Sequence, residues 1–288
     1  MTSPRVLFIG RATLDVVYSF NQFPSEDSKI FARDIRVAPG GPATNAAMTH
    51  AQLGGKALLM TAIGSGPWGA QVRDELDRLA IDIIDLAENT PFKTPLTTVL
   101  VNESGATRTI VNPPHSEVAL RTMDAWDQAW GPMPALVLTD GFHLSQTLPL
   151  LKACHAAGAQ ICLDGGSWKP GTEDLPRLLT VAISSERFTV PGQPADPSAA
   201  IGWFAGMGVP FVAITRGNQN ILACERGRRF EIEIERIDAV NTLGAGDVLH
   251  GAFCYDFARE EAFEPALRNA AAIATRSCRG WGIRGPRG

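Results

Sequence analysis

Short, continuously apolar runs alternate with amphipathic segments along most of this 288-residue chain. The apolar runs predict strands at 6–9, 57–63, 135–139, 160–163, 181–184 and 211–215. The amphipathic segments predict helices at 44–53, 70–79, 148–157, 199–207, 247–261 and 265–276. Strands that are apolar throughout are typical of a parallel sheet covered by helices on both faces. The pattern therefore predicts an α/β fold with a doubly wound, mostly parallel sheet flanked by helices.

Two regions break this alternation. Residues 16–37 and 96–111 contain β-branched stretches without intervening helices, and Asn102 to Gly105 form a turn between two strand-like runs. We expect these regions to form a small β-sheet lid, spanning approximately 12–38 and 94–112. Because the chain has no internal repeat or long linker, we expect one domain over 1–288 that carries the lid as an insertion.

Charge and composition narrow the class of partner. The net charge of -4 leaves no basic face for nucleic acid and no polybasic anchor for a membrane. The five cysteines are scattered singly, which predicts neither a zinc site nor a disulfide framework. The apolar run at 6–9 is too short for a signal sequence, so we expect a cytoplasmic protein that acts on a small molecule.

The segment from Asn241 to Asp247 carries the most specific chemical signal. Gly244 and Gly246 precede an apolar-faced helix, where unpaired N–H groups and the helix dipole attract phosphate oxygens. A carboxylate at Asp247 would repel phosphate unless it serves as a base for an attacking hydroxyl. The alternative is that Asp247 simply caps the helix.

A second glycine cluster precedes the helix expected at 44–53. Gly40 and Gly41 would let a ligand approach the backbone closely, and Asn45 offers a donor and acceptors that suit a sugar hydroxyl. An ordinary loop is the alternative. Since ligands of open α/β sheets bind beyond the carboxyl ends of the strands, residues 10–15, 140–143, 164–166 and 215–217 are further candidates.

The order of these motifs resembles the PfkB, or ribokinase-like, family of carbohydrate kinases. The resemblance rests on the early Gly-Gly-x-x-x-Asn, on Thr215-Arg216-Gly217, and on the run from Thr242 to Asp247. It covers nearly the whole chain and implies a ribokinase-like fold. It also implies an ATP-dependent sugar kinase that uses Mg²⁺.

The resemblance assigns a role to each matching residue. Asp247 would deprotonate the acceptor hydroxyl, while an anion hole would come from Gly244, Ala245 and Gly246. Substrate would be bound by Asp15, Gly40, Gly41, Asn45 and Arg108. The nucleotide would be bound by Thr215, Gly217, Thr242 and Asn269.

For several of these residues, a purely structural or solvent-exposed role is the alternative. Asp15 could be a solvated loop acid, and Asn269 could lie on a helix surface. Arg108 and Lys29 could be charges that protect an edge strand. If both instead face the substrate, they hint at a carboxylate, sulfonate or phosphate on the sugar.

The chain also departs from the family pattern. Asn241 stands where the family usually has Asp, which argues against activation by K⁺. The Asn-x-x-Glu segment that organises Mg²⁺-bound water is not intact near residues 184–187. Glu186 and Asp164 are candidates to contact the metal through water, and a role in a turn is the alternative for Asp164.

Residues Gly64 to Gly69 match the G-x-G-x-x-G dinucleotide motif, with Asp82 and Asp85 downstream. This match would make the protein an NAD-dependent oxidoreductase, although Pro67 lacks an N–H where donors are needed. A sugar-binding regulator without catalysis is a further alternative. The favoured interpretation is a kinase that transfers the γ-phosphoryl group of ATP to a primary hydroxyl of a ketohexose or sugar-acid derivative. Pairing of exposed lid edges would give a homodimer.

Overall fold

A computed structural model describes residues 4–114 and 116–280 of the protein. Within them, nine strands form the main sheet in the order β13-β12-β11-β10-β9-β8-β1-β4-β5. The strands are β1 (Arg5–Ile9), β4 (Lys56–Thr61), β5 (Asp82–Asp85), β8 (Leu136–Thr139), β9 (Gln160–Gly165), β10 (Val181–Ser185), β11 (Phe211–Arg216), β12 (Gln219–Glu225) and β13 (Arg228–Ile232). Neighbours are parallel from β5 to β11, whereas β12 and β13 are antiparallel additions at one edge. The mostly parallel sheet confirms the predicted fold class.

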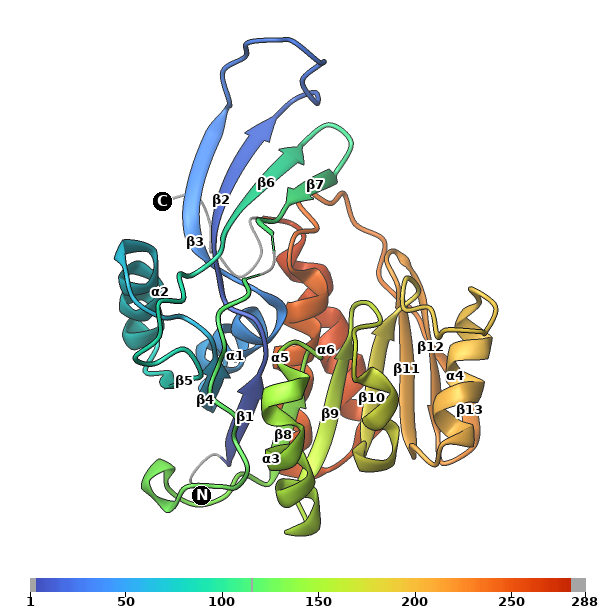
Figure 1. Cartoon of the computed structure of the whole chain (residues 1–288). Coiled ribbons are helices and arrows are strands. Elements are labelled where there is room, and N and C mark those ends of the chain that lie inside the picture. Colours follow the sequence, from blue (N-terminus) through green and yellow to red (C-terminus); the bar gives the residue numbers. More distant parts are fainter. Residues whose placement is uncertain (1–3, 115, 281–288) are drawn as a thin grey trace.

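Helices cover both faces of this sheet (Figure 1). They are α1 (Pro42–Gln52), α2 (Pro67–Arg78), α3 (Leu144–Ala156), α4 (Pro197–Gly206), α5 (Ala245–Glu260) and α6 (Phe263–Ser277), with short 3-10 helices η1 (Gln128–Trp130), η2 (Thr172–Asp174) and η3 (Pro176–Leu178). No helix in the described part of the chain is long and apolar enough to span a membrane.

The central strands supply side chains to two separate hydrophobic cores. In β1, Val6 and Phe8 pack with α1, α2, α5 and α6, while Leu7 and Ile9 pack with α3 and α4. Successive side chains of a strand point to opposite faces, so a strand buried on both faces must be apolar at every position. This requirement explains the continuous apolar runs of the sequence.

A second, four-stranded sheet stands beyond the carboxyl ends of the main strands (Figure 1). Its order is β3-β2-β6-β7, with bounds β2 (Thr13–Phe20), β3 (Asp34–Gly40), β6 (Leu96–Asn102) and β7 (Thr107–Val111). Val17, Val99 and Val101 form a small apolar cluster against Leu243, on the turn before α5. We call this sheet the lid sheet, and the cluster joins it to the region around the start of α5.

Candidate active site

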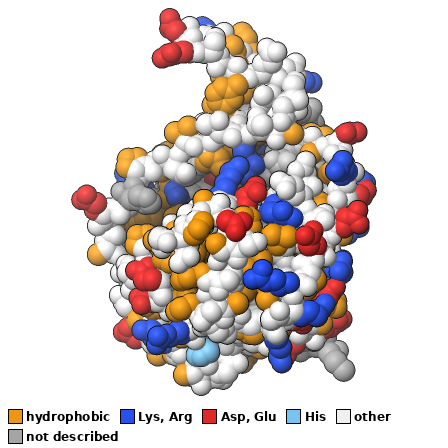
Figure 2. All heavy atoms as spheres, turned by 90° about the vertical axis from the view of Figure 1, so that its right-hand side faces the viewer, with side chains coloured by type: hydrophobic (Ala, Val, Ile, Leu, Met, Phe, Trp, Pro, Cys, Tyr) orange, Lys and Arg blue, Asp and Glu red, His pale blue; other side chains and the backbone are white. Residues whose placement is uncertain are grey.

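A large cleft lies between the lid sheet and the carboxyl ends of the main strands. Its walls include residues of both sheets, of the α1 and α5 amino ends, and of the turn between β11 and β12. Figure 2 shows basic and acidic side chains next to one another in the hollow at the foot of the protruding lid sheet. This is where open α/β sheets bind their ligands.

The amino end of α5 forms the floor of the cleft. Gly244 precedes the helix with a left-handed φ of 74°, and the N–H groups of Gly246 and Asp247 donate to no group among the described residues. The N–H of Ala245 instead donates to the carbonyl oxygen of Thr242 at 3.3 Å. Unpaired amides at a helix amino end are strong ligands for phosphate.

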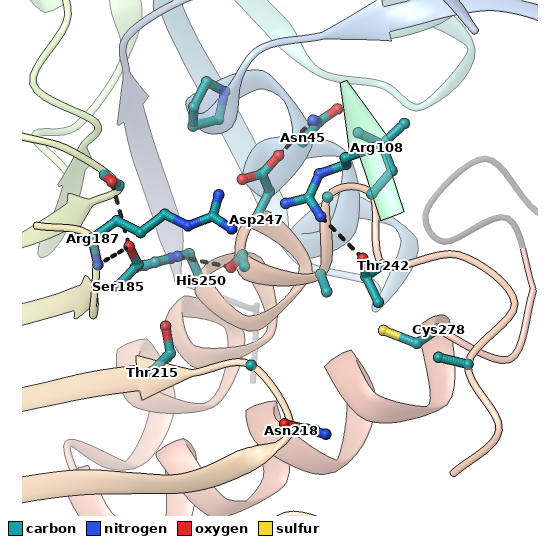
Figure 3. Close-up of a pocket in the computed structure, with 18 of the residues that line it drawn as sticks. Asn45, Arg108, Ser185, Arg187, Thr215, Asn218, Thr242, Asp247, His250 and Cys278 are labelled. Atoms are coloured by element: carbon teal, nitrogen blue, oxygen red, sulfur yellow. Dashed lines mark hydrogen bonds between the residues drawn. The ribbon is translucent and has the colours of Figure 1, made fainter. Parts of the chain in front are cut away.

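Asp247 lies in the first turn of α5, where its Oδ2 accepts a hydrogen bond from Asn45 Nδ2 at 2.6 Å (Figure 3). Burial and the nearby Asp164 carboxylate raise the pKa of Asp247 to about 7, while Asn45 and His250 oppose this shift. A carboxylate with a pKa near neutrality can accept a proton from a substrate and release it again. The sequence separates Asn45 and Asp247 by 202 residues, and the fold brings them into contact.

Asp15 is buried in β2 on the side of the cleft nearest α1. Its Oδ1 accepts a hydrogen bond from Thr13 Oγ1 at 2.6 Å. A Cβ at Gly40 would lie 2.1 Å from Asp15 Oδ2, so glycine is needed there to leave room for the carboxylate. Gly40 therefore packs against Asp15, whereas Gly41 lines the cleft itself.

Asp140 holds the loops around this part of the site together. Its carboxylate accepts N–H hydrogen bonds from Arg11, Ala43 and Phe142, at 2.9, 3.1 and 2.9 Å. Burial raises the pKa of Asp140 to about 6, although the charge of Lys169 and the N–H donors oppose the shift. The side chain of Arg11 also lines the cleft and lies over the Phe142 ring, 5.2 Å from its centroid.

A second group of predicted residues lines the opposite end of the cleft. Thr215 and Gly217 lie at and after the end of β11, and Thr242 lies before α5. Thr242 Oγ1 accepts a hydrogen bond from Arg108 Nη1 at 3.0 Å, which links the lid sheet to the α5 turn. The prediction missed Asn218, Thr275 and Cys278, which also line this end.

Two predicted site residues lie elsewhere. Asn269 is on the exposed face of α6, where its amide donates to Asp256 Oδ2 at 2.6 Å, and the α6 residue that lines the cleft is Thr275. Lys29 is exposed in the loop between β2 and β3, beyond the cleft walls. The sequence predicted both residues at the cleft, whereas neither is among the residues that line it. A motif specifies neither which face of a helix a residue occupies nor how far a loop reaches.

The metal candidates differ in their surroundings. Asp164 is buried at the end of β9, with its Oδ2 3.4 Å from His250 Nδ1 and without a hydrogen bond from any described group. Glu186 is exposed on the cleft wall after β10. No cluster of three or more His, Cys, Asp or Glu side chains suited to a metal occurs among the described residues.

The Gly64 to Gly69 segment packs against Asp85 and Phe92. The N–H groups of Ile63 and Gly64 donate to the Asp85 carboxylate at 2.9 and 3.0 Å, and that carboxylate also pairs with Arg73 at 2.5 Å. A Cβ at Gly64 would lie 2.2 Å from the Phe92 carbonyl oxygen. The dinucleotide interpretation is therefore wrong, since the N–H groups of Gly64 and Ser65 already donate to Asp85 and to the Phe92 carbonyl oxygen, and Pro67 has no N–H.

The lid sheet over a doubly wound sheet, with a carboxylate beside unpaired helix amides, defines a phosphotransferase for small molecules. Residues 3–285 match the family described as "pfkB family carbohydrate kinase". The chain belongs to the PfkB family of carbohydrate kinases.

Several ribokinases and fructokinases are similar to this chain. A ribokinase of Haemophilus influenzae is 22% identical over 282 residues, covering 92% of this chain and 89% of its own. A fructokinase of Escherichia coli is 22% identical over 263 residues, covering 85% and 81%. The solved ribokinase of Giardia lamblia superposes with a TM-score of 0.80 at 18% identity, covering 98% and 95%. Arabidopsis thaliana ribokinase, solved with ribose and ATP, has a TM-score of 0.74 at 22% identity, covering 99% and 95%.

Proposed function

We propose that the protein transfers the γ-phosphoryl group of ATP to a primary hydroxyl of a small sugar. The observation that carries the proposal is the carboxylate of Asp247 beside the unpaired amides of Gly246 and its own backbone. The amides suit the negative charge of the moving phosphoryl group, and the carboxylate suits the proton of the attacking hydroxyl. A protein that bound sugar without transferring phosphate would not need a carboxylate beside amides that suit phosphate.

In the proposed complex, the sugar lies near Asp15, Gly41 and Asn45, and ATP lies near Thr215, Gly217 and Thr242. Asp15 can accept hydrogen bonds from sugar hydroxyls, and the Asn45 side chain can both donate and accept. Asn45 would thereby contact the sugar and Asp247 together. The primary hydroxyl fits because it is the least hindered oxygen to reach between two walls of a cleft.

A neutral ketohexose fits better than an acid-bearing sugar. Lys29 lies away from the cleft, and Arg108 reaches toward Asp247 and Thr242, which is the phosphate side of the proposed complex. Arg11 remains near the sugar, but burial lowers its pKa while the Asp140 and Asp15 carboxylates oppose that effect. Carboxylates that already balance this guanidinium would repel an anionic substituent.

Mg²⁺ bound mainly by ATP phosphates and water fits the acidic groups of the cleft. Asp164 offers a buried oxygen without a hydrogen-bond donor, and Glu186 offers an exposed carboxylate. When bound, the metal would neutralise phosphate charge. Asn241 is buried and its Oδ1 accepts a hydrogen bond from the N–H of Leu243 at 2.8 Å. Because its side chain is a neutral amide, it supplies no negative charge for K⁺.

A phosphoryl-transfer screen with Mg-ATP tests the proposal across ketohexoses, aldoses, sugar acids, sulfosugars and nucleosides. We expect turnover of a neutral ketohexose and its loss in Asp247→Asn. Sugar binding without phosphate transfer at saturating Mg-ATP would favour the regulator instead. Turnover confined to sugar acids would overturn the preference for neutral substrates.

We also propose that two lid sheets pair in a homodimer. Ile35, Val37 and Val111 are 54%, 42% and 56% exposed. In the register of β2 and β3, Val37 pairs with Val16 and Ile35 pairs with Tyr18. These side chains point to the face of the sheet opposite Val17, which is buried on the cleft side. An exposed apolar sheet face of this kind supports association with a second copy.

A further inference from the structure

Arg187 reaches into the cleft from the loop after β10. Its backbone N–H donates to Ser185 Oγ at 3.1 Å, and that hydroxyl lies 3.4 Å from the carbonyl oxygen of Gly166, to which it donates. These bonds tie the turn after β10 to the loop after β9. The side chain then extends toward Asp247, as Figure 3 shows.

The guanidinium of Arg187 makes no hydrogen bond or ion pair with any residue that the structure describes. Arg108 approaches from the opposite side, on lid strand β7, and also points toward Asp247 (Figure 3). Burial lowers the pKa of Arg108, the charge of Arg187 lowers it further, and Asp247 opposes both effects. The two cations are therefore close enough to repel each other across the cleft above the amino end of α5.

A single carboxylate does not balance this arrangement. Asp247 already accepts a short hydrogen bond from Asn45, and its pKa is raised by burial to about 7, so it carries only part of a negative charge at neutral pH. The nearby N–H groups of Gly246 and Asp247 are also donors without acceptors in the described chain. Two guanidiniums and two amides directed at one space fit a group with several anionic oxygens.

We propose that Arg187 is a catalytic residue, which binds the γ-phosphoryl group of ATP opposite Arg108 and stabilises it during transfer. This assignment rests on the proposed kinase function. In the step concerned, the substrate hydroxyl oxygen forms a bond to the γ-phosphorus and its proton passes to Asp247. The bond from the γ-phosphorus to the β,γ-bridging oxygen breaks, and its electron pair leaves with ADP. Arg187 and Arg108 bind equatorial phosphoryl oxygens from the two sides of the cleft.

Steady-state kinetics with the accepted sugar compare Arg187→Gln, Arg187→Lys and Arg177→Gln with the wild type. Arg177 is the control: it is an exposed arginine before the amino end of β10, whereas Arg187 follows the carboxyl end of the same strand. Arg177→Gln therefore removes the same charge at the opposite end of β10. We expect Arg187→Gln to lower kcat by ~10²-fold, with the KM for the sugar changed by less than about 2-fold. Arg187→Lys keeps the charge without the fork of donors and is expected to recover part of the rate. Arg177→Gln is expected to match the wild type.

A second measurement needs no sugar. Calorimetry compares the binding of ADP with that of a non-hydrolysable ATP analogue to the wild type and to Arg187→Gln, both with Mg²⁺. We expect the substitution to weaken binding of the analogue by about 10-fold and to leave ADP binding unchanged, which also shows that the variant is folded. An equal effect on both nucleotides, or a kcat within about 3-fold of the wild type, would overturn the assignment. If the wild type phosphorylates no sugar, the proposed function fails, and the comparison of the two nucleotides still decides the role of Arg187.

Discussion

Asn45 Nδ2 donates a 2.6 Å hydrogen bond to Asp247 Oδ2, and this bond joins the first turns of α1 and α5 at the floor of the cleft. The residue proposed to hold the sugar thus contacts the residue proposed to accept its proton. A sugar hydroxyl bound by Asn45 would be within reach of the Asp247 carboxylate. In the proposed complex, sugar binding and proton transfer would therefore be coupled through one amide.

Asp247→Asn removes the proposed base and nearly preserves its shape. We expect kcat to fall by ~10²-fold or more with little change in sugar affinity, because the proton is transferred only in the transition state. Steady-state kinetics and sugar binding by calorimetry measure the two effects. Asp256→Asn, in the same helix but bonded to Asn269 outside the cleft, is the matched control. Near wild-type turnover in Asp247→Asn would remove this residue from the mechanism.

The rate should depend on pH through the same carboxylate. Since Asp247 must be deprotonated to accept a proton, and its pKa is about 7, kcat should rise with pH and level off above about 8. The Asn45 hydrogen bond stabilises the ionised form, so Asn45→Ala should move the rise to higher pH by about one unit. Asn269→Ala removes an amide outside the cleft and should leave the profile in place. A profile that is flat from pH 5 to 9 would contradict this account.

The raised pKa of Asp247 also predicts a cost in stability at higher pH. The folded protein binds the proton more tightly than the unfolded chain, so this group stabilises the fold below pH 4, and the contribution is lost as pH rises through about 7. Asp247→Asn should therefore unfold at a higher temperature than the wild type at pH 8 and at a similar temperature at pH 4. The difference at pH 8 should be on the order of 1 to 2 kcal/mol, because the cleft leaves the carboxylate partly in contact with solvent. Thermal denaturation at both pH values measures it.

Pairing of lid sheets predicts a change of oligomeric state on surface substitution. Replacing Ile35 and Val37 by Lys places two like charges on the exposed face of β3, within the apolar surface that is proposed to pair. We expect sedimentation velocity to find a dimer for the wild type and a monomer for this variant. Lysine substitution at exposed Met207, at the end of α4 and away from the lid sheet, should leave the dimer intact. A wild-type monomer at micromolar concentration would contradict the pairing.

The sequence predicted the elements that are buried on two faces. β1, β4, β8, β9, β10 and β11 are apolar almost throughout, and each coincides with an expected strand. β12 and β13 were missed because they lie toward a sheet edge, where polar side chains can face solvent. Gln219, Glu225 and Arg228 are such side chains, and they interrupt the apolar run that would mark a strand. α3 begins at Leu144, before the predicted start, because its first turn lacks a clear apolar period.

The site was predictable where a local motif determines it. Gly244 to Asp247 lie at a helix start, and Asp15 and Asn45 line the cleft together with them. Arg187 and Thr275 were missed, because a lone arginine after a strand and a threonine late in a helix carry no motif. Only the tertiary arrangement of the β10 loop and α6 brings them to the same cleft.

Gly41 and Gly246 provide a matched pair of glycine substitutions in the cleft. Gly41 has a φ of 98°, and an added Cβ would lie 2.1 Å from the backbone oxygen of Arg11, which cannot move away as a side chain could. We expect Gly41→Ala to lower the free energy of unfolding by about 2 to 4 kcal/mol and to weaken sugar binding with it. Chemical denaturation measures the first effect and calorimetry the second.

Gly246→Ala should have the opposite balance of effects. A Cβ there meets no atom within 4 Å, and alanine favours a helix more than glycine does, so the unfolding free energy should stay equal or rise by up to about 1 kcal/mol. The new methyl group would instead occupy the space in front of the unpaired amides at the start of α5. The KM for ATP should rise by about 10-fold, as expected when one hydrogen bond to a charged group is lost. A stable Gly246→Ala variant with unchanged KM for ATP would show that the phosphates of ATP bind away from these amides.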